Sequence, residues 1–279
     1  CLIGLLLGSC TRSPMLPHTL EVPAQTLSLP DLPPVVDRRA RFRSLFCGLL
    51  DQPQACEELL LRFRGEPEAV ATTRPMPEHV PSLRVILVPG LFNECFSQWV
   101  GFYGDAIEWL RVRGYEIETL LVNSRSSSGH NAAQIAAYVA SLPVETDRPL
   151  VLIGHSKGSV DILQFLVEYP EPAARVAAVV SIAGAINGSP LADWMQANWK
   201  GWRRLIPSSL CDPGDEQAIE SLTRLERLTW LSTHSLPTPP HYFSLGLKLV
   251  EIRSDGDHRG PEIFTEFFDR NPAFIVDQF

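Results

Sequence analysis

From Leu83 onward, short aliphatic runs alternate with stretches in which apolar residues recur at helical spacing. The aliphatic runs predict buried strands at Arg84–Val88, Ile117–Val122, Leu150–Ile153 and Ala177–Ile182. The stretches between them predict helices at Tyr103–Arg113, Asn131–Ser141 and Ser159–Glu168. Strands that are apolar on both faces and alternate with helices are typical of a parallel sheet covered on both sides. The pattern therefore predicts an α/β fold with a doubly wound, mostly parallel sheet, in a domain at residues 82–279.

The chain before this domain has a different pattern. Asp37 is a candidate N-cap for a helix with apolar positions at Phe42, Leu45, Phe46 and Leu49. A second short helix is predicted at Glu57–Phe63, and a loop follows it. We assign residues 37–81 to an N-terminal helical segment and loop. Residues 11–36 are rich in proline, which indicates an extended tether.

The composition narrows the function classes. The chain has 279 residues, of which 45% are hydrophobic, and this length can bury a sizeable core. Its formal net charge is -8, and its Lys and Arg residues form no long run. Nucleic-acid-binding proteins concentrate basic residues on one surface, so the charge pattern argues against nucleic acid as a partner. The sequence does not indicate an oligomeric state.

Residues 1–10 have the sequence CLIGLLLGSC, which is apolar but too short to span a bilayer. They are typical of the end of an export signal, in which the small residues Gly8 and Ser9 precede a cysteine. This stretch resembles a bacterial lipoprotein signal, which implies cleavage before Cys10 and attachment of lipid to it. We therefore expect an exported lipoprotein, anchored at the periplasmic face of a membrane or at the cell surface. The alternative is a buried apolar helix end.

The remaining cysteines suggest disulfides. If Cys10 is lipidated and Cys1 is removed with the signal, an even set remains, which an exported chain can oxidise: Cys47, Cys56, Cys95 and Cys211. Several pairings are open. We favour Cys47–Cys56 with Cys95–Cys211, because the first pair closes a local helical hairpin. The alternative is a set of ordinary buried thiols.

One motif has the pattern of a catalytic site. Gly154-x-Ser156-x-Gly158 falls between the predicted strand Leu150–Ile153 and the helix that follows, which is the pattern of a nucleophile elbow. The serine of such an elbow occupies a strained turn, so its neighbours two positions away must be small for strand and helix to approach. Ser156 would then stand at a helix N-terminus, where free N–H groups and the helix dipole favour developing negative charge. The motif predicts a nucleophilic serine.

Acyl transfer also requires donors that hold an oxyanion. One candidate is the N–H of Lys157, the residue after the serine, and a second is the N–H of Leu91, in the loop after the first strand. The segments "ILVPGLF", "LIGHSKGS" and "SIAGAINGSPLAD" resemble the oxyanion strand, the elbow and the following loop of α/β-hydrolases of the lipase and esterase type. The chain is similar to bacterial lipases and to the lipid deacylases that act on GPI anchors. The resemblance covers residues 82–260 and implies their fold.

The resemblance also implies an acid and a histidine, in that order after the serine. Asp255, followed by a glycine, best matches the family's acid, and Asp257 is the alternative. His258 is the last histidine of the chain and lies close to Asp255 in sequence. Either His258 acts as the base in an irregular arrangement, or the base lies beyond Phe279. Because the sequence lacks an initiator Met and ends without a closing strand and helix, we expect it to be truncated at both ends.

The other ionisable residues near the motif fit the base role less well. His234 and His241 precede the acid, and an elbow histidine such as His155 normally points away from the serine. The side chain of Lys157, on the first turn of a helix, should leave in a direction away from Ser156. We interpret the region around His130 as a helix start, with Ser128 or His130 near the cap.

A lid is expected at about residues 187–240, where these folds carry insertions. Four tryptophans fall there or at its end: Trp194, Trp199, Trp202 and Trp230. The stretch "LADWMQANWKGWRRLIP" predicts an amphipathic helix with tryptophans beside basic residues, which suits a water–lipid interface. The alternative is that these rings pack the lid on the core. A disulfide between Cys95 and Cys211 would hold the lid over the site.

These patterns predict a serine hydrolase that cleaves carboxylic esters, of lipids above all, through an acyl-enzyme on Ser156. No cofactor is expected, and no metal-binding cluster is recognisable. Acyl transfer with the same serine is an alternative. A non-catalytic protein of this fold that binds lipid or a partner through the lid is another.

Overall fold

The computed structural model describes residues 38–49, 56, 83–93, 103–143, 148–198, 212–247 and 274–275. They contain a sheet with the strand order β2-β1-β3-β4-β5-β6. The strands are β1 (Arg84–Val88), β2 (Glu116–Thr119), β3 (Leu150–His155), β4 (Val176–Ile182), β5 (His241–Leu247) and β6 (Phe274–Ile275). Neighbouring strands from β2 to β5 are parallel, and β6 is antiparallel to β5. The predicted mostly parallel sheet is confirmed.

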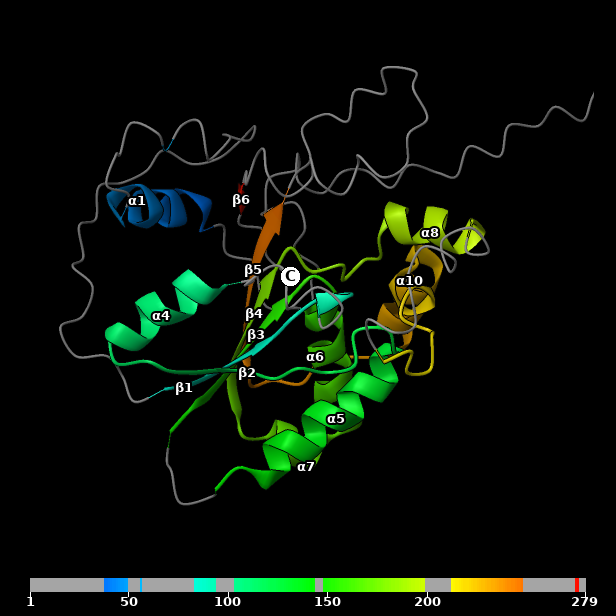
Figure 1. The fold of residues 1–279 in the computed structure, drawn as a ribbon, viewed down its shortest axis with the longest axis horizontal. Helices are drawn as coiled ribbons and strands as arrows, with labels where there is room; N and C mark the ends of the chain where they lie inside the picture. The colour runs from blue at the N-terminus through cyan, green and yellow to red at the C-terminus, as the bar shows by residue number, and fades with distance from the viewer. Residues whose placement is uncertain are drawn as a thin grey trace, which may run out of the picture.

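Helices lie on both faces of this sheet (Figure 1). One face carries α4 (Gly104–Val112), with α1 (Arg39–Leu49) on the same side, and the other carries α5 (Ser128–Ser141), α6 (Lys157–Glu168) and α7 (Pro170–Ala173). From β1 the chain moves outward to β2 through α4, then returns past β1 to β3 through α5. Right-handed crossovers in opposite directions place their helices on opposite faces. The doubly wound α/β fold is confirmed.

The end of β2 differs from the prediction. β2 stops at Thr119 and does not continue to Val122. Its partner β1 ends one residue after Leu87, which pairs with Thr119. The Leu120 amide still donates to the Leu87 carbonyl at 2.9 Å, and the chain then leaves the sheet. Apolar sequence alone cannot give this end, because it depends on how far the partner strand extends.

The start of α5 also differs from the prediction. The helix begins at Ser128, three positions before the predicted Asn131. Its N-cap is Ser127, whose Oγ accepts a hydrogen bond from the His130 amide at 3.2 Å. A capping serine satisfies one of the free N–H groups of a first turn and fixes where the helix starts. The cap is therefore Ser127, one residue before Ser128 and three before His130, the two residues that we expected near the cap.

The main core fills the space between the sheet and the helices α5 and α6. Leu150, Leu152 and Gly154 of β3 are buried on this side, whereas the residues between them are only half-buried. The same core contains these fully or almost fully buried side chains: Ile86, Val88, Ile135, Val139, Ile162, Leu163, Phe165, Leu166 and Val179. Each such side chain contributes roughly 1.5–3 kcal/mol relative to an exposed position. This packing fixes α6, and with it the segment before it, against the sheet.

The helix α1 carries a disulfide. Cys47 is bonded to Cys56, with a Cα–Cα distance of 5.3 Å, so the pairing that we favoured for these two residues is confirmed. The rings of Phe42 and Phe46 stack along the helix at 5.7 Å. Other predicted features lie outside the described residues: the signal and tether at 1–36, Cys10, Cys95, Cys211, Asp255, Asp257 and His258.

The segment between β4 and β5 contains α8 (Pro190–Ala197), the 3-10 helix η4 (Glu220–Leu222) and α10 (Arg224–Thr233). The helices α8 and α10 lie side by side (Figure 1). The helix α8 ends at Ala197, and the Asn198 side-chain amide donates to the Trp194 carbonyl at 2.8 Å. The rest of the stretch predicted as an amphipathic helix lies outside the described residues. Among the described residues, no helix is long and apolar enough to cross a membrane.

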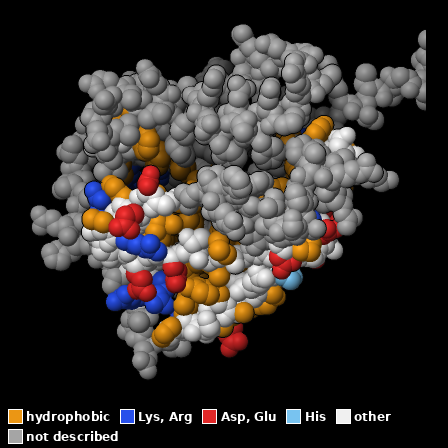
Figure 2. Space-filling view, viewed as in Figure 1, with side chains coloured by type: hydrophobic (Ala, Val, Ile, Leu, Met, Phe, Trp, Pro, Cys, Tyr) orange, Lys and Arg blue, Asp and Glu red, His pale blue; other side chains and the backbone are white. Residues whose placement is uncertain are grey.

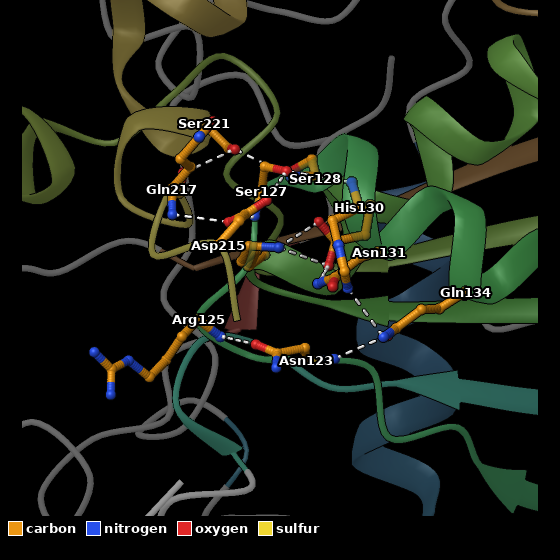
Figure 3. A network of polar contacts seen from close by, with 12 residues as sticks. Asn123, Arg125, Ser127, Ser128, His130, Asn131, Gln134, Asp215, Gln217 and Ser221 are labelled. Atoms are coloured by element: carbon orange, nitrogen blue, oxygen red, sulfur yellow. Dashed lines mark hydrogen bonds and ion pairs between the residues drawn. The ribbon is translucent and has the colours of Figure 1, made fainter. Parts of the chain in front are cut away.

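The turn at residues 212–217 is clasped to the start of α5 (Figure 3). The Asp215 carboxylate accepts the Ser127 amide at 2.7 Å and the Ser127 hydroxyl at 2.5 Å. The Asp215 amide in turn donates to Ser126 Oγ at 3.1 Å. Next to it, Gly214 has a φ of 55°, and a Cβ there would lie 2.0 Å from Ser126 Oγ. A second bond joins the Ser128 amide to Ser221 Oγ at 3.0 Å. We call these contacts the 215–127 clasp.

We predict that Asp215→Asn weakens this clasp in a pH-dependent way. Burial raises the pKa of Asp215, but hydrogen bonds from Ser127 and from the Gln217 amide outweigh it, so the pKa is lowered. A carboxyl with a lowered folded-state pKa stabilises the fold above its unfolded pKa of about 3.9, and this contribution is lost as the pH falls. The variant should lose about 1 kcal/mol at pH 7 and much less near pH 3.

Urea unfolding at pH 7, 5 and 3 measures the difference. Asp105→Asn is the matched control, since Asp105 is exposed on α4 and lies away from the clasp. An equal loss of stability for Asp215→Asn at every pH would contradict the prediction.

Candidate active site

Ser156 stands in a strained turn between β3 and α6. Its φ is 53° and its ψ is -118°, a conformation that residues other than glycine rarely adopt. Such a backbone costs about 1–3 kcal/mol and persists only where the surrounding structure fixes it. Ser156 is also the N-cap residue of α6, but its side chain caps no amide of the helix. The hydroxyl is therefore held at the helix N-terminus without being used for capping.

The glycines on either side of Ser156 are required by close backbone contacts. A Cβ on Gly158 would lie 2.1 Å from the Val88 carbonyl oxygen. A Cβ on Gly154 would lie 2.5 Å from the Cα of Ser159. Both contacts are with backbone atoms, which cannot move aside without shifting a strand or a helix. The spacing Gly-x-Ser-x-Gly thus reports the approach of α6 to β1 and β3.

Two buried serines that the sequence did not single out support the turn. Ser159 Oγ donates to the Gly154 carbonyl at 2.7 Å, and Ser181 Oγ donates to Ser159 Oγ at 3.0 Å. Each of the two side chains is 1% exposed. The Ser156 amide also donates to the Ile182 carbonyl at the end of β4, at 2.9 Å. These bonds tie the elbow to the helix and to the neighbouring strand. In the sequence, Ser159 and Ser181 were recognisable only as small residues.

Ser156 lies at the point where the sheet changes winding direction. The chain leaves β1 toward β2 on one side, and β3 lies on the other side of β1. Ligands of open α/β sheets bind at such switch points, beyond the carboxyl ends of the strands. A Cβ on Gly90, just past β1, would lie 2.9 Å from the Ser156 Cβ, so the loop after β1 touches the serine.

The predicted oxyanion donors flank this contact. Leu91 follows Gly90 in the loop, and Lys157 follows Ser156 on the first turn of α6. Neither backbone amide donates a hydrogen bond to another described residue. Free N–H groups on both sides of a nucleophile have the chemistry of an oxyanion site. The structure thus brings Ser156, Leu91 and Lys157 into one region of the fold.

Lys157 has its side chain committed elsewhere. Its Nζ donates to both carboxylate oxygens of Asp161, at 2.7 and 2.9 Å, and the exposures of the two residues are 1% and 0%. The Asn131 side-chain amide, from α5, donates to Asp161 at 2.7 Å. Burial lowers the pKa of Lys157 and raises the pKa of Asp161, while the attraction between them opposes both shifts. The sequence analysis missed this pair, although its i,i+4 spacing on a helix was visible.

His155, next to the elbow, is half-buried. Its ring meets the Tyr103 ring edge-on, with the centroids 5.4 Å apart. Loss of hydration lowers the pKa of His155 to about 4, so its imidazole is neutral at pH 7. The same loss of hydration raises the pKa of Tyr103. This histidine is part of the packing under the loop after β1.

The other described histidines lie away from Ser156. His130 contacts Gln134 on the exposed side of α5. His234 stacks on Trp230 at 4.7 Å, and His241 begins β5, at the sheet edge opposite the carboxyl ends of the strands. Within the described ranges, no histidine or carboxylate is hydrogen-bonded to the Ser156 hydroxyl. The predicted acid and base, Asp255 and His258, lie outside these ranges, so their roles stay predictions.

A second apolar cluster lies beside the elbow. It joins Phe92 of the loop after β1 and Val160 of α6 to side chains from the segment between β4 and β5, which are Ala192, Met195, Ile219 and Leu222. Leu91 and Ala185 pack against it. Two tryptophans of this segment lie within the described residues. Trp230 is 7% exposed in the main core, and Trp194 on α8 is 50% exposed.

The charges of the described surface show no single-sign patch on the face in Figure 2, where acidic and basic side chains of described residues are interspersed. The described residues also include no cluster of His, Cys, Asp or Glu that could hold a metal ion.

We predict that Gly158→Ala disrupts the elbow. Its methyl group would overlap the Val88 carbonyl, and overpacking against backbone costs typically 1–3 kcal/mol or more. Thermal unfolding should show a large loss of stability, or the variant should fail to fold. Gly104→Ala is the matched control, because a Cβ there meets nothing within 4 Å. Equal unfolding midpoints for the two variants would show that α6 does not approach β1 this closely.

Comparison with solved structures gives the family. A metagenomic carboxyl esterase, MGS0156, is 36% identical, with a TM-score of 0.68 over 80% of this chain and 68% of that one. The mature lipase BlEst2 of Bacillus licheniformis is 21% identical, with a TM-score of 0.48 over 62% of this chain and 67% of that one. Phospholipase PlaB of Legionella pneumophila is 15% identical, with a TM-score of 0.40 over 55% of this chain and 34% of that one. No family model and no curated protein matched. With this parallel sheet, this elbow and this identity to MGS0156, the chain belongs to the esterases and lipases of the α/β-hydrolase superfamily.

Proposed function

We propose that this chain is a serine hydrolase that cleaves carboxylic esters through an acyl-enzyme on Ser156. The observation that carries the proposal is the strained Ser156 at the switch point of the sheet, next to the free amides of Leu91 and Lys157. Strain of this kind concentrates at functional sites, because it holds a reacting group in one orientation. The membership in a family with a carboxyl esterase at 36% identity supports the same reaction class.

In the proposed reaction, Ser156 Oγ attacks the ester carbonyl carbon while a histidine takes its proton. The Leu91 and Lys157 N–H groups and the N-terminus of α6 stabilise the oxyanion. The tetrahedral intermediate collapses, the histidine protonates the departing alkoxide, and the acyl group stays on Ser156. Water then attacks the acyl-enzyme by the same steps and releases the acid. We assign the orienting carboxylate to Asp255 and, if the chain is complete, the base to His258.

A lipid ester is the substrate class that we propose. The cluster of Phe92, Val160 and Met195 lies beside the loop after β1, so the surroundings of Ser156 on this side are apolar. On the outside of the same segment, Leu191 and Trp194 of α8 and Leu225 of α10 are 47%, 50% and 80% exposed. Exposed apolar side chains on neighbouring helices favour contact with an apolar surface. This arrangement suits an ester presented by a lipid.

The test is turnover of p-nitrophenyl esters of increasing chain length, together with labelling by a fluorophosphonate and mass mapping of the label. Ser156→Ala should lower kcat on the order of 10⁴-fold or more and abolish labelling. Ser141→Ala, at the exposed end of α5, is the matched control. Rates that rise with chain length support the lipid substrate. Folded wild-type protein that neither labels nor turns over would favour the non-catalytic, lipid-binding alternative.

We further propose that Cys10 carries a lipid anchor, which places the hydrolase at a bacterial membrane on the periplasmic face or at the cell surface. The support is the resemblance of residues 1–10 to a lipoprotein signal and the tether after it. Full-length protein expressed in a Gram-negative host should incorporate labelled palmitate and fractionate with membranes. Both properties should be lost in Cys10→Ser and kept in Cys1→Ser. Labelling that survives in Cys10→Ser would refute the anchor.

A further inference from the structure

The ion pair of Lys157 and Asp161 is a buried charged group for which the reaction has no direct use. Both side chains are excluded from solvent, and the pair is bonded twice. Removing two charges from water is costly, and apolar pairs of similar volume are often equally or more stabilising. The stability of the fold therefore gives no reason for an ion pair at this position. The location of the pair provides a different reason.

The pair spans the first turn of the helix that begins at the nucleophile. Lys157 is the residue after Ser156, and its backbone amide is one of the proposed oxyanion donors. Its side chain is bonded one turn further along α6, to Asp161. Because the amide and the side chain belong to the same residue, a fixed side chain limits the rotation of that peptide. The positive φ of Ser156 requires restraints of this kind from its surroundings.

The pair is also anchored outside α6. Asn131 of α5 donates to Asp161 at 2.7 Å, and Asn131 is itself 0% exposed. Asn131 lies on the first turn of α5, whose cap Ser127 is held by the 215–127 clasp (Figure 3). The buried Arg227 of α10 also attracts Asp161 electrostatically and donates to the Ile186 carbonyl at 3.2 Å. The position of Asp161 is thus set by elements other than its own helix.

We infer that Lys157 and Asp161, anchored by Asn131, form a positioning pair that holds the Lys157 amide and the Ser156 turn in the geometry needed to stabilise the oxyanion. The inference rests on the proposed esterase function. The pair touches no reacting atom and acts through the backbone. Its loss should therefore weaken transition-state stabilisation and leave substrate binding nearly unchanged.

The main test is the double variant Lys157→Met/Asp161→Leu, which removes both charges of the pair and leaves the buried Asn131 amide without its acceptor. We expect a folded protein whose unfolding midpoint falls by several degrees, because a buried donor is left unpaired. We expect kcat to fall on the order of 10- to 100-fold, with KM changed by less than about two-fold. Affinity for a trifluoromethyl ketone, which forms an oxyanion adduct on serine, should fall by the same factor as kcat/KM. Affinity for an unreactive ether analogue of the ester should stay the same.

The matched control is Arg84→Met/Glu116→Leu. Arg84 Nη2 and Glu116 form an ion pair at 2.6 Å at the amino-terminal ends of β1 and β2, away from the carboxyl ends where Ser156 lies, so its removal should leave kcat and the ketone affinity unchanged. If the main double variant does not fold, Asn131→Ser carries the test, because it removes the anchor and keeps both charges paired. It should show a smaller drop in kcat of the same kind.

Two results would overturn the inference. One is a stable double variant with wild-type kcat. The other is a fall in stability, kcat and KM together while the ketone affinity stays constant, which would make the pair merely structural. Failure of the proposed function looks different: the wild type would show no ester turnover, or its turnover would survive Ser156→Ala.

Discussion

The close approach of α6 to the carboxyl end of β1 is the constraint on which the site depends. The Val88 carbonyl leaves no room for a side chain at position 158, and the same approach brings Gly90 against the Ser156 Cβ. A helix this close to two strands forces the residue between strand and helix into a positive φ. The strained turn at Ser156 is therefore a consequence of packing, and the hydrophobic core between α6 and the sheet supplies the free energy that maintains it.

The strand order brings the separate parts of the candidate site next to one another. Because β3 lies next to β1 and β2 lies on the far side, the loops after β1 and β3 meet without a helix between them. One loop brings Leu91 and the other brings Ser156 and Lys157, so the proposed oxyanion donors come from segments far apart in sequence. The small side chains of Ser159 and Ser181 also let β4 lie close to α6. The donors gain their positions from strand ends, which are among the most rigid parts of the fold.

Polar contacts extend this order from the sheet to the segment between β4 and β5. The 215–127 clasp fixes the second half of that segment to the start of α5, and Asn131 of the same helix holds Asp161. The start of α5 is thus a junction between the candidate lid and the elbow. The apolar cluster around Phe92 and Met195 packs the same segment against the loop after β1. The hydrogen bonds fix the orientation of these segments, because each bond requires a particular donor and acceptor. The apolar cluster contributes buried surface area.

The sequence by itself determined the features that depend on neighbouring residues. Aliphatic runs and helical periodicity predicted the parallel sheet and its helices, the glycine spacing predicted the elbow, and local spacing predicted the Cys47–Cys56 disulfide. Only the tertiary structure decided where β2 ends, since that depends on β1, and which residues hold the elbow. Ser127 and Asp215 are 88 positions apart, and Asn131 and Asp161 are 30 apart. Such pairs leave no periodic signal, because a hydrogen bond between distant segments is set by strand order and helix packing.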